Sequence, residues 1–244
     1  MTACLVEALV TARRLTRRGV LLATGSLVVL ALCYAGLVNP VGSPRAALSA
    51  ATELAALVVL VVSAGIVADD RSHGRLTMPA THPAPPSAWV VGRWLAVSGF
   101  GAAVLVAASA LLLAVAHAPA TAGVAAAELC ALAHVAVLAS AAVALSCAAG
   151  PTAQVLLLLA LWIAGAMAPE AVGALVGAAW VTGLVRALWT ALPSPWALGR
   201  LLDWALGAGA PAPAAALVLA LQPSLWLGAG ARRLALAELA ARDG

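Results

Sequence analysis

The chain has no lysine and few charged residues of any kind. All thirteen basic residues among its 244 residues are arginines. Charged residues make up 9% of the sequence, whereas a typical soluble domain carries about 25%. The absence of lysine excludes the phosphate-binding loop G-x-x-x-x-G-K-[ST], so we expect no ATP hydrolysis by this chain. The shortage of charge excludes an ordinary soluble domain, because most of the surface cannot face water.

Paired cysteines and clustered basic residues are also missing. None of the four cysteines forms a CxxC pair, so we expect neither a disulfide framework nor a zinc site. The arginines are not interleaved with aromatic residues in a patch, which argues against a nucleic-acid partner. Leu32 is too large for the residue that precedes a lipoprotein cysteine. We therefore expect the apolar stretch around Cys33 to be an uncleaved signal anchor.

Apolar residues dominate what is present. They make up 64% of the sequence, and the mean hydropathy is +1.07. A transmembrane barrel needs strands that alternate polar and apolar residues, whereas this chain carries unbroken apolar runs such as residues 95–116. Because every backbone polar group must be satisfied inside a bilayer, these runs predict an all-α integral membrane protein.

The hydrophobic runs predict six transmembrane helices, since about 20 helical residues cross the ~30 Å hydrocarbon core. Gly150-Pro151 separates the fourth from the fifth, because proline favours the first turn of a helix. The predicted spans are residues 19–38, 48–68, 94–116, 122–148, 152–168 and 212–231.

Two further segments are expected at the membrane surface. Residues 1–18 predict an amphipathic interfacial helix, with Glu7, Thr11, Arg14 and Arg18 on one side; a solvated tail is the alternative. Residues 170–210 predict short helices that dip into or lie along the outer leaflet. Four of the eight tryptophans fall there, and tryptophan favours the membrane–water interface.

The arginines indicate the orientation. Six spans with a cytoplasmic N-terminus place ten arginines inside and three outside, namely Arg45, Arg186 and Arg200. A seventh span would place seven arginines inside and six outside. Because cytoplasmic segments carry the excess of arginine, we expect six spans with both termini in the cytoplasm.

Ionisable residues inside the spans are the candidates for chemistry. They are Glu53 and Glu128, expected near the outer ends of their helices, and His134. His134 lies about 240° around the helix from Glu128, so the two do not share a face. A metal or haem role for His117 and His134 is the alternative to ordinary polar contacts within a bundle. No catalytic constellation appears, and we predict that the chain is not an enzyme.

The informative segment is the predicted inner loop, residues 69–93, which combines charges, histidines and prolines. Asp69, Asp70 and Arg71 form a cluster of acidic and basic residues. Gly74 and Leu76 follow on either side of position 75. Pro83 and the pair Gly92-Arg93 come later in the loop. This order resembles the loop after the second helix in type-2 ABC transporter permeases, the transmembrane subunits of ABC exporters. Arg75 stands where that family carries threonine.

The resemblance implies one permease domain, residues 1–244, whose loop contacts a cytoplasmic ABC ATPase subunit. That subunit would hold ATP and Mg²⁺, so no cofactor is expected in this chain. The contact residues would be Asp70, Arg71, His73, Gly74, Arg75, Leu76 and Pro83.

The resemblance further implies a second permease copy or paralogue in a bacterial inner membrane. It also implies an apolar path, lined by the first, second and fifth spans, for a hydrophobic or amphipathic substrate. The alternatives are a haem-exporter-like permease subunit, a non-transporting membrane anchor or a membrane enzyme. For the loop at residues 69–93, the alternative is an ordinary polar connection between two helices.

Overall fold

The described part of the chain is built from α-helices. The computed structural model describes residues 2–17, 25, 43–64, 66–67, 85–192 and 194–240, and every regular element in these ranges is an α-helix. This confirms the predicted all-α class for the described residues. The helices are α1 Thr2–Arg17, α3 Pro44–Ser63, α5 Pro86–Val115, α6 Ala122–Ala148, α7 Pro151–Ala166, α8 Pro169–Val176, α9 Ala179–Ala191, α10 Pro195–Ala205 and α11 Pro213–Ala240.

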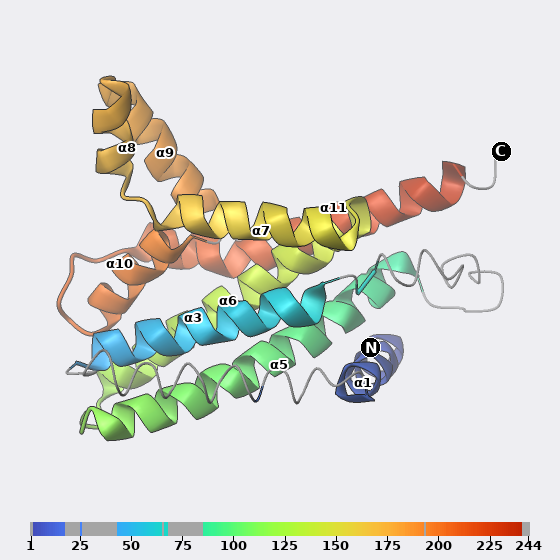
Figure 1. The fold of residues 1–244 in the computed structure, drawn as a ribbon, viewed down its shortest axis with the longest axis horizontal. Coiled ribbons are helices and arrows are strands. Elements are labelled where there is room, and N and C mark those ends of the chain that lie inside the picture. The colour runs from blue at the N-terminus through green and yellow to red at the C-terminus, as the bar shows by residue number, and fades with distance from the viewer. Residues whose placement is uncertain are drawn as a thin grey trace.

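Three long helices form the centre of the molecule. α3, α5 and α6 run alternately up and down beside one another, α11 packs along α6 and α5, and α7 lies over the opposite side of α6 from α5 (Figure 1). The core between them consists of small and branched side chains, among them Val58, Leu105 and Val135. Small residues let apolar helices approach closely, which suits packing in a membrane.

The same three helices are long and apolar enough to cross a bilayer. α7 and α8 meet the same criteria as a pair, although the chain bends by 87° between them. The chain is therefore described as a helical membrane protein with at least three candidate spans among the described residues. Six spans stay a prediction: the first lies at residues 19–38, outside the described residues except for Gly25, and the sixth falls within α11, which contains Pro223.

The helix boundaries correct the predicted ones at two places. α3 is shifted towards the N-terminus relative to the predicted span 48–68, because Ser43 caps it by accepting a 3.2 Å hydrogen bond from the Ala46 amide. α5 begins at Pro86, so residues 86–93 of the predicted loop form its first two turns. Proline is well suited to the first helical position, since it lacks the amide that would remain unpaired there.

The alternating directions give the bundle two distinct ends (Figure 1). At one end, which we call the loop end, α3 and α6 finish, α5 and α7 begin, and α11 finishes. α1 also lies near this end, across the beginning of α5. The opposite end, which we call the α10 end, holds the start of α3, the turn between α5 and α6, and helices α8 to α10.

Residues 169–205 form three short helices, and the predicted position of this region in or along the outer leaflet stays a prediction. α8 and α9 make a hairpin that projects away from the bundle at the α10 end (Figure 1). Gly177 closes the hairpin with φ +70°, a left-handed conformation that glycine adopts without steric penalty. The hairpin carries exposed apolar side chains, including Leu175 and Trp180, which are 78% and 71% exposed.

Candidate functional site

The predicted ATPase contacts lie outside the described residues. Asp70, Arg71, His73, Gly74, Arg75, Leu76 and Pro83 all belong to the stretch 68–84. The structure does describe the two places where this stretch joins the bundle. These are the last turn of α3, at Ser63, and the first two turns of α5, residues 86–93.

The first turns of α5 are held by α1. A Cβ atom at Gly92 would lie 2.6 Å from Glu7 Cβ and 2.9 Å from the Cys4 carbonyl oxygen. No side chain fits in that space, so glycine allows the two helices to cross in direct backbone contact. The sequence pointed to Gly92 for its place in the loop motif. Its close approach to α1 is a long-range contact that the motif does not encode.

Arg93 forms the polar centre of this crossing. Its side chain is 3% exposed, and its Nη1 atom lies 3.4 Å from Glu7 Oε2. The Arg93 Cζ atom also lies 3.3 Å from the centroid of the Trp89 ring, in a cation–π arrangement. A buried guanidinium is stable only when its charge is compensated. The Glu7 carboxylate supplies that compensation from α1.

The two sides of α1 differ in their exposure. Thr11 and Leu15 are buried against the protein, while Leu5, Val6 and Leu9 are exposed. The apolar face therefore points away from the bundle, and Arg13 and Arg14 are exposed as well. An exposed apolar helix face is suited to a membrane surface, and the interfacial position of α1 stays a prediction.

The end of α3 is held by Gln154 of α7. The Gln154 side chain is fully buried, and its Nε2 atom lies 3.0 Å from the Ser63 carbonyl oxygen, 3.3 Å from Ser63 Oγ and 3.0 Å from the Ala142 carbonyl oxygen. One amide thus connects α3, α6 and α7 at the loop end. No motif in the sequence singles out Gln154. The available signal was a side-chain amide at the first turn of an apolar helix.

Replacing Gln154 with leucine is expected to lower the free energy of unfolding by about 1–2 kcal/mol, because the buried Ser63 and Ala142 carbonyls lose a donor. The measurement is unfolding of the purified chain in mixed micelles with increasing sodium dodecyl sulfate. Thr152→Val is the matched control, since Thr152 is exposed in the same turn of α7. Equal midpoints for the two variants would contradict the role given to Gln154.

The histidines are not brought together. His117 follows α5 at the α10 end, with φ 50°, while His134 lies within α6. His134 comes twelve residues after Ala122, the start of α6, which is about 18 Å along the axis. His134 is buried beside Trp162, with ring centroids 5.7 Å apart. Among the described residues, no group of three histidine, cysteine or acidic side chains is placed to hold a metal ion.

The two glutamates in the candidate spans differ in environment. Glu128 accepts a 2.7 Å hydrogen bond from Ser109, which joins α6 to α5. Glu53 is the tenth of the 20 residues of α3 and is exposed. The prediction that Glu53 lies near the outer end of its helix is therefore wrong, because α3 starts earlier than the apolar run indicates.

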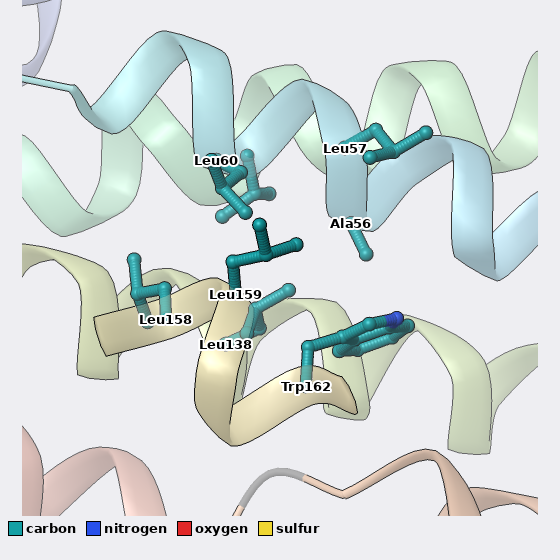
Figure 2. A pocket seen from close by; sticks show the side chains of 8 residues that line it. Ala56, Leu57, Leu60, Leu138, Leu158, Leu159 and Trp162 are labelled. Atoms are coloured by element: carbon teal, nitrogen blue, oxygen red, sulfur yellow. The ribbon is translucent and has the colours of Figure 1, made fainter. Parts of the chain in front are cut away.

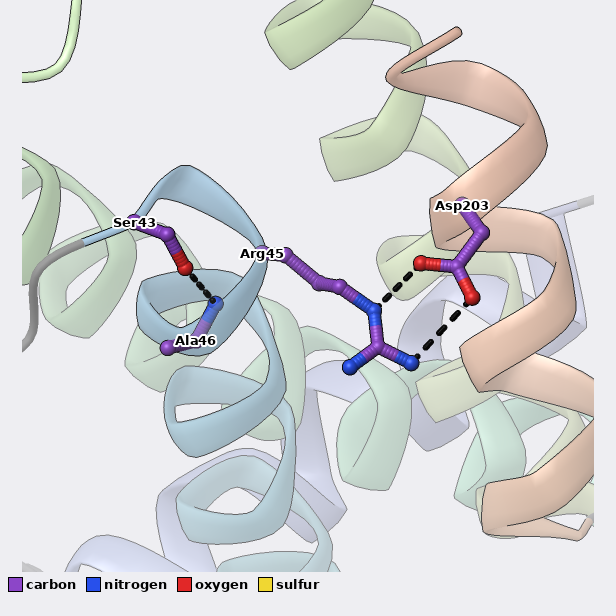
Figure 3. Close-up of polar contacts among 4 residues, drawn as sticks. All are labelled: Ser43, Arg45, Ala46 and Asp203. Carbon is purple, nitrogen blue, oxygen red and sulfur yellow. Dashed lines mark hydrogen bonds and ion pairs between the residues drawn. The ribbon is translucent and has the colours of Figure 1, made fainter. Parts of the chain in front are cut away.

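Two ion pairs lie at the α10 end. Arg45 donates from Nε and Nη2 to the Asp203 carboxylate, so the first turn of α3 is tied to α10 (Figure 3). Arg186 Nη2 lies 2.6 Å from Glu170 Oε1 and joins α9 to α8. Both pairs are exposed and contribute little to stability. They link α3 to α10 and α8 to α9 by polar contacts.

No family model matches the sequence, and no curated protein matches it.

Proposed function

We propose that this chain is the transmembrane subunit of an ATP-binding cassette exporter, and that residues 68–84 contact a cytoplasmic ATPase. The observation that carries the proposal is that buried polar contacts hold both ends of this segment. Gln154 holds α3 at Ser63, and Glu7 holds α5 at Arg93. A force applied to the segment would move α3 and α5 directly, and α1, α6 and α7 through these contacts.

The distribution of arginine supports the orientation in this proposal. Arg13, Arg14, Arg93, Arg232 and Arg233 belong to α1, the start of α5 and the second half of α11, at the loop end. Arg45, Arg186 and Arg200 belong to the α10 end. Because cytoplasmic segments are enriched in arginine, the loop end would face the cytoplasm, where an ATPase is available. The N- and C-termini would then be cytoplasmic, in a bacterial inner membrane.

The motor would have to come from a partner, because the chain has no lysine for a phosphate-binding loop. Two ATPase subunits and a second permease copy or paralogue would complete the transporter. ATP and Mg²⁺ would be bound by the ATPases. The apolar surfaces of α3 and α7 suit a hydrophobic or amphipathic substrate.

The test is affinity purification of the tagged chain in mild detergent, after expression with its genomic neighbours, followed by mass spectrometry. We expect recovery of an ATPase that carries a phosphate-binding loop. Substituting both Gly74 and Arg75 should abolish this recovery, while Arg45→Ala at the α10 end should leave it unchanged. Recovery of the intact chain without an ATPase would favour a non-transporting anchor or a membrane enzyme.

A further inference from the structure

An open groove of about 440 Å³ lies along the second half of α11. Its lining combines apolar, small and basic side chains, among them Leu225, Leu236, Gly228, Ala229, Arg232 and Arg233. All of these residues are exposed. The groove therefore offers apolar contacts and positive charge side by side, and it can be entered along its whole length.

The groove points away from the bundle. Gly230 lies on the packed side of α11, where a Cβ atom would be 3.1 Å from Ala144 Cα of α6. Gly228 precedes it by two residues, about 200° around the helix, and a Cβ atom there would meet nothing within 4 Å. The missing side chain at Gly228 leaves a hollow one turn before Arg232.

The contact at Gly230 also gives the depth of the groove relative to a candidate span. Ala144 is in the last two turns of α6, which ends at Ala148 and is long and apolar enough to cross a bilayer. α6 and α11 both finish at the loop end (Figure 1). Arg232 and Arg233 follow Gly230 by about 3–5 Å along the axis. They are therefore level with the end of α6, where arginine side chains would reach the headgroups of a bilayer.

Exposed leucines continue the groove towards the middle of the bundle. Leu217, Leu221 and Leu225 are 62%, 55% and 72% exposed, and their four-residue spacing places them along one face of α11. Arg232 follows Leu221 by about 16 Å along the axis. This is close to half of the ~30 Å hydrocarbon core of a bilayer, so the stripe has the length of an acyl chain in one leaflet.

The two arginines of the groove are available to an anion. The described side chains give neither Arg232 nor Arg233 a hydrogen bond or an ion pair. Arg45 and Arg186, at the α10 end, are instead bound to the carboxylates of Asp203 and Glu170. The guanidinium group matches the geometry of a phosphate group, to which it can donate two parallel hydrogen bonds.

The apolar surface between α3, α6 and α7 offers no comparable space (Figure 2). There Leu159 and Trp162 of α7 face Ala56 and Leu60 of α3, and the space left between the side chains is about 20 Å³. That volume is enough for a single water molecule. An acyl chain has room on α11 and not at this position.

We propose that the groove on α11 binds an anionic phospholipid from the leaflet at the loop end, with its phosphate at Arg232 and Arg233 and one acyl chain along the leucines. A second copy of the chain is a poorer occupant. A symmetric contact through this face would place Arg232 against its counterpart, and like charges repel. The proposal goes beyond the proposed function, because lipid binding needs no ATPase.

The test is titration of the purified full chain in detergent with dioleoyl-phosphatidylglycerol, followed by native mass spectrometry. Dioleoyl-phosphatidylcholine is the lipid without net charge. We expect tighter binding of the anionic lipid, weakened by about tenfold or more when Arg232→Gln and Arg233→Gln are combined. Arg232→Lys with Arg233→Lys keeps the charge and should retain most of the preference. Gly228→Leu should weaken binding by filling the groove without changing the charge.

Each change has a matched control. Arg45→Gln with Arg186→Gln removes the same charge at the α10 end, where both arginines are already paired. Gly183→Leu adds the same side chain at an exposed glycine of α9, where a Cβ atom also meets nothing within 4 Å. Both controls should bind the anionic lipid as the wild type does.

Three results would overturn the proposal. They are equal binding of the two lipids by the wild type, unchanged binding of the anionic lipid when both groove arginines are glutamine, and an equal loss in the paired-arginine control. A dimer that Gly228→Leu dissociates, without any lipid preference, would also overturn it and would assign this face to a second copy of the chain.

Discussion

Replacing Arg93 with alanine is expected to lower the free energy of unfolding by about 3–5 kcal/mol, the range found when one partner of a buried ion pair is removed. The reason is the environment of the pair. The Arg93 side chain is 3% exposed and faces the Glu7 carboxylate, which is itself largely buried. Alanine would leave that carboxylate uncompensated at the crossing of α1 and α5, and the contact with Trp89 would also be lost.

The measurement is denaturation of the purified variant in mixed micelles, compared with wild type. Arg13→Ala is the control, since Arg13 is exposed on α1 and a surface substitution there should change stability by less than about 0.5 kcal/mol. Adding Glu7→Gln to Arg93→Ala should recover part of the loss, because the unpaired charge is removed. A loss for Arg93→Ala no larger than that for Arg13→Ala would show that the crossing does not depend on this pair.

Deleting residues 74–83 is expected to reduce substrate-stimulated ATP hydrolysis to the basal rate of the ATPase alone, while the chain still inserts in the membrane. A soluble ATPase can move a membrane bundle only through the segment that it touches. In the proposed function that segment is residues 68–84, which follow α3 and precede α5 in the chain. Membrane insertion depends on the apolar helices, which the deletion leaves intact. The measurement is ATP hydrolysis by the reconstituted complex, with and without substrate.

The control for the deletion is Arg45→Ala, which breaks the contact between α3 and α10 at the opposite end of the bundle. It should preserve the stimulation. Normal stimulation by the variant that lacks residues 74–83 would contradict a coupling role for this segment. The contacts of Gln154 and Arg93 would then have a structural role only.

Helix positions were predictable where local signals mark both ends. The prediction for α6 agrees with residues 122–148, because Thr121 caps its start by accepting a hydrogen bond from Val124 and Gly150-Pro151 follows its end. The start of α5 was missed for a local reason as well. The charges and prolines of residues 69–93 predict a loop that includes Pro85-Pro86, whereas Pro86 occupies the first helical position, which suits proline.

The contacts at the candidate site were not predictable, because they join residues far apart in the chain. Glu7 and Arg93 are 86 residues apart, and Gln154 and Ser63 are 91 residues apart. In the sequence, Glu7 belongs to the polar side of a predicted helix and Arg93 to the loop motif, while Gln154 is only a polar residue beside apolar ones. Helical periodicity gives the face on which a side chain lies, and it does not give the helix that this face meets. The pairing depends on how α1, α5 and α7 pack.

The measurement that tests the central claim most directly is photo-cross-linking in living cells from a photoreactive amino acid placed at position 75. The comparison is the same amino acid at position 118, in the turn between α5 and α6 at the α10 end. We predict an adduct with an ATPase that carries a phosphate-binding loop from position 75 and none from position 118. Absence of an ATPase adduct at position 75, or equal yields from both positions, would contradict the assignment of residues 68–84 as the contact with a cytoplasmic motor.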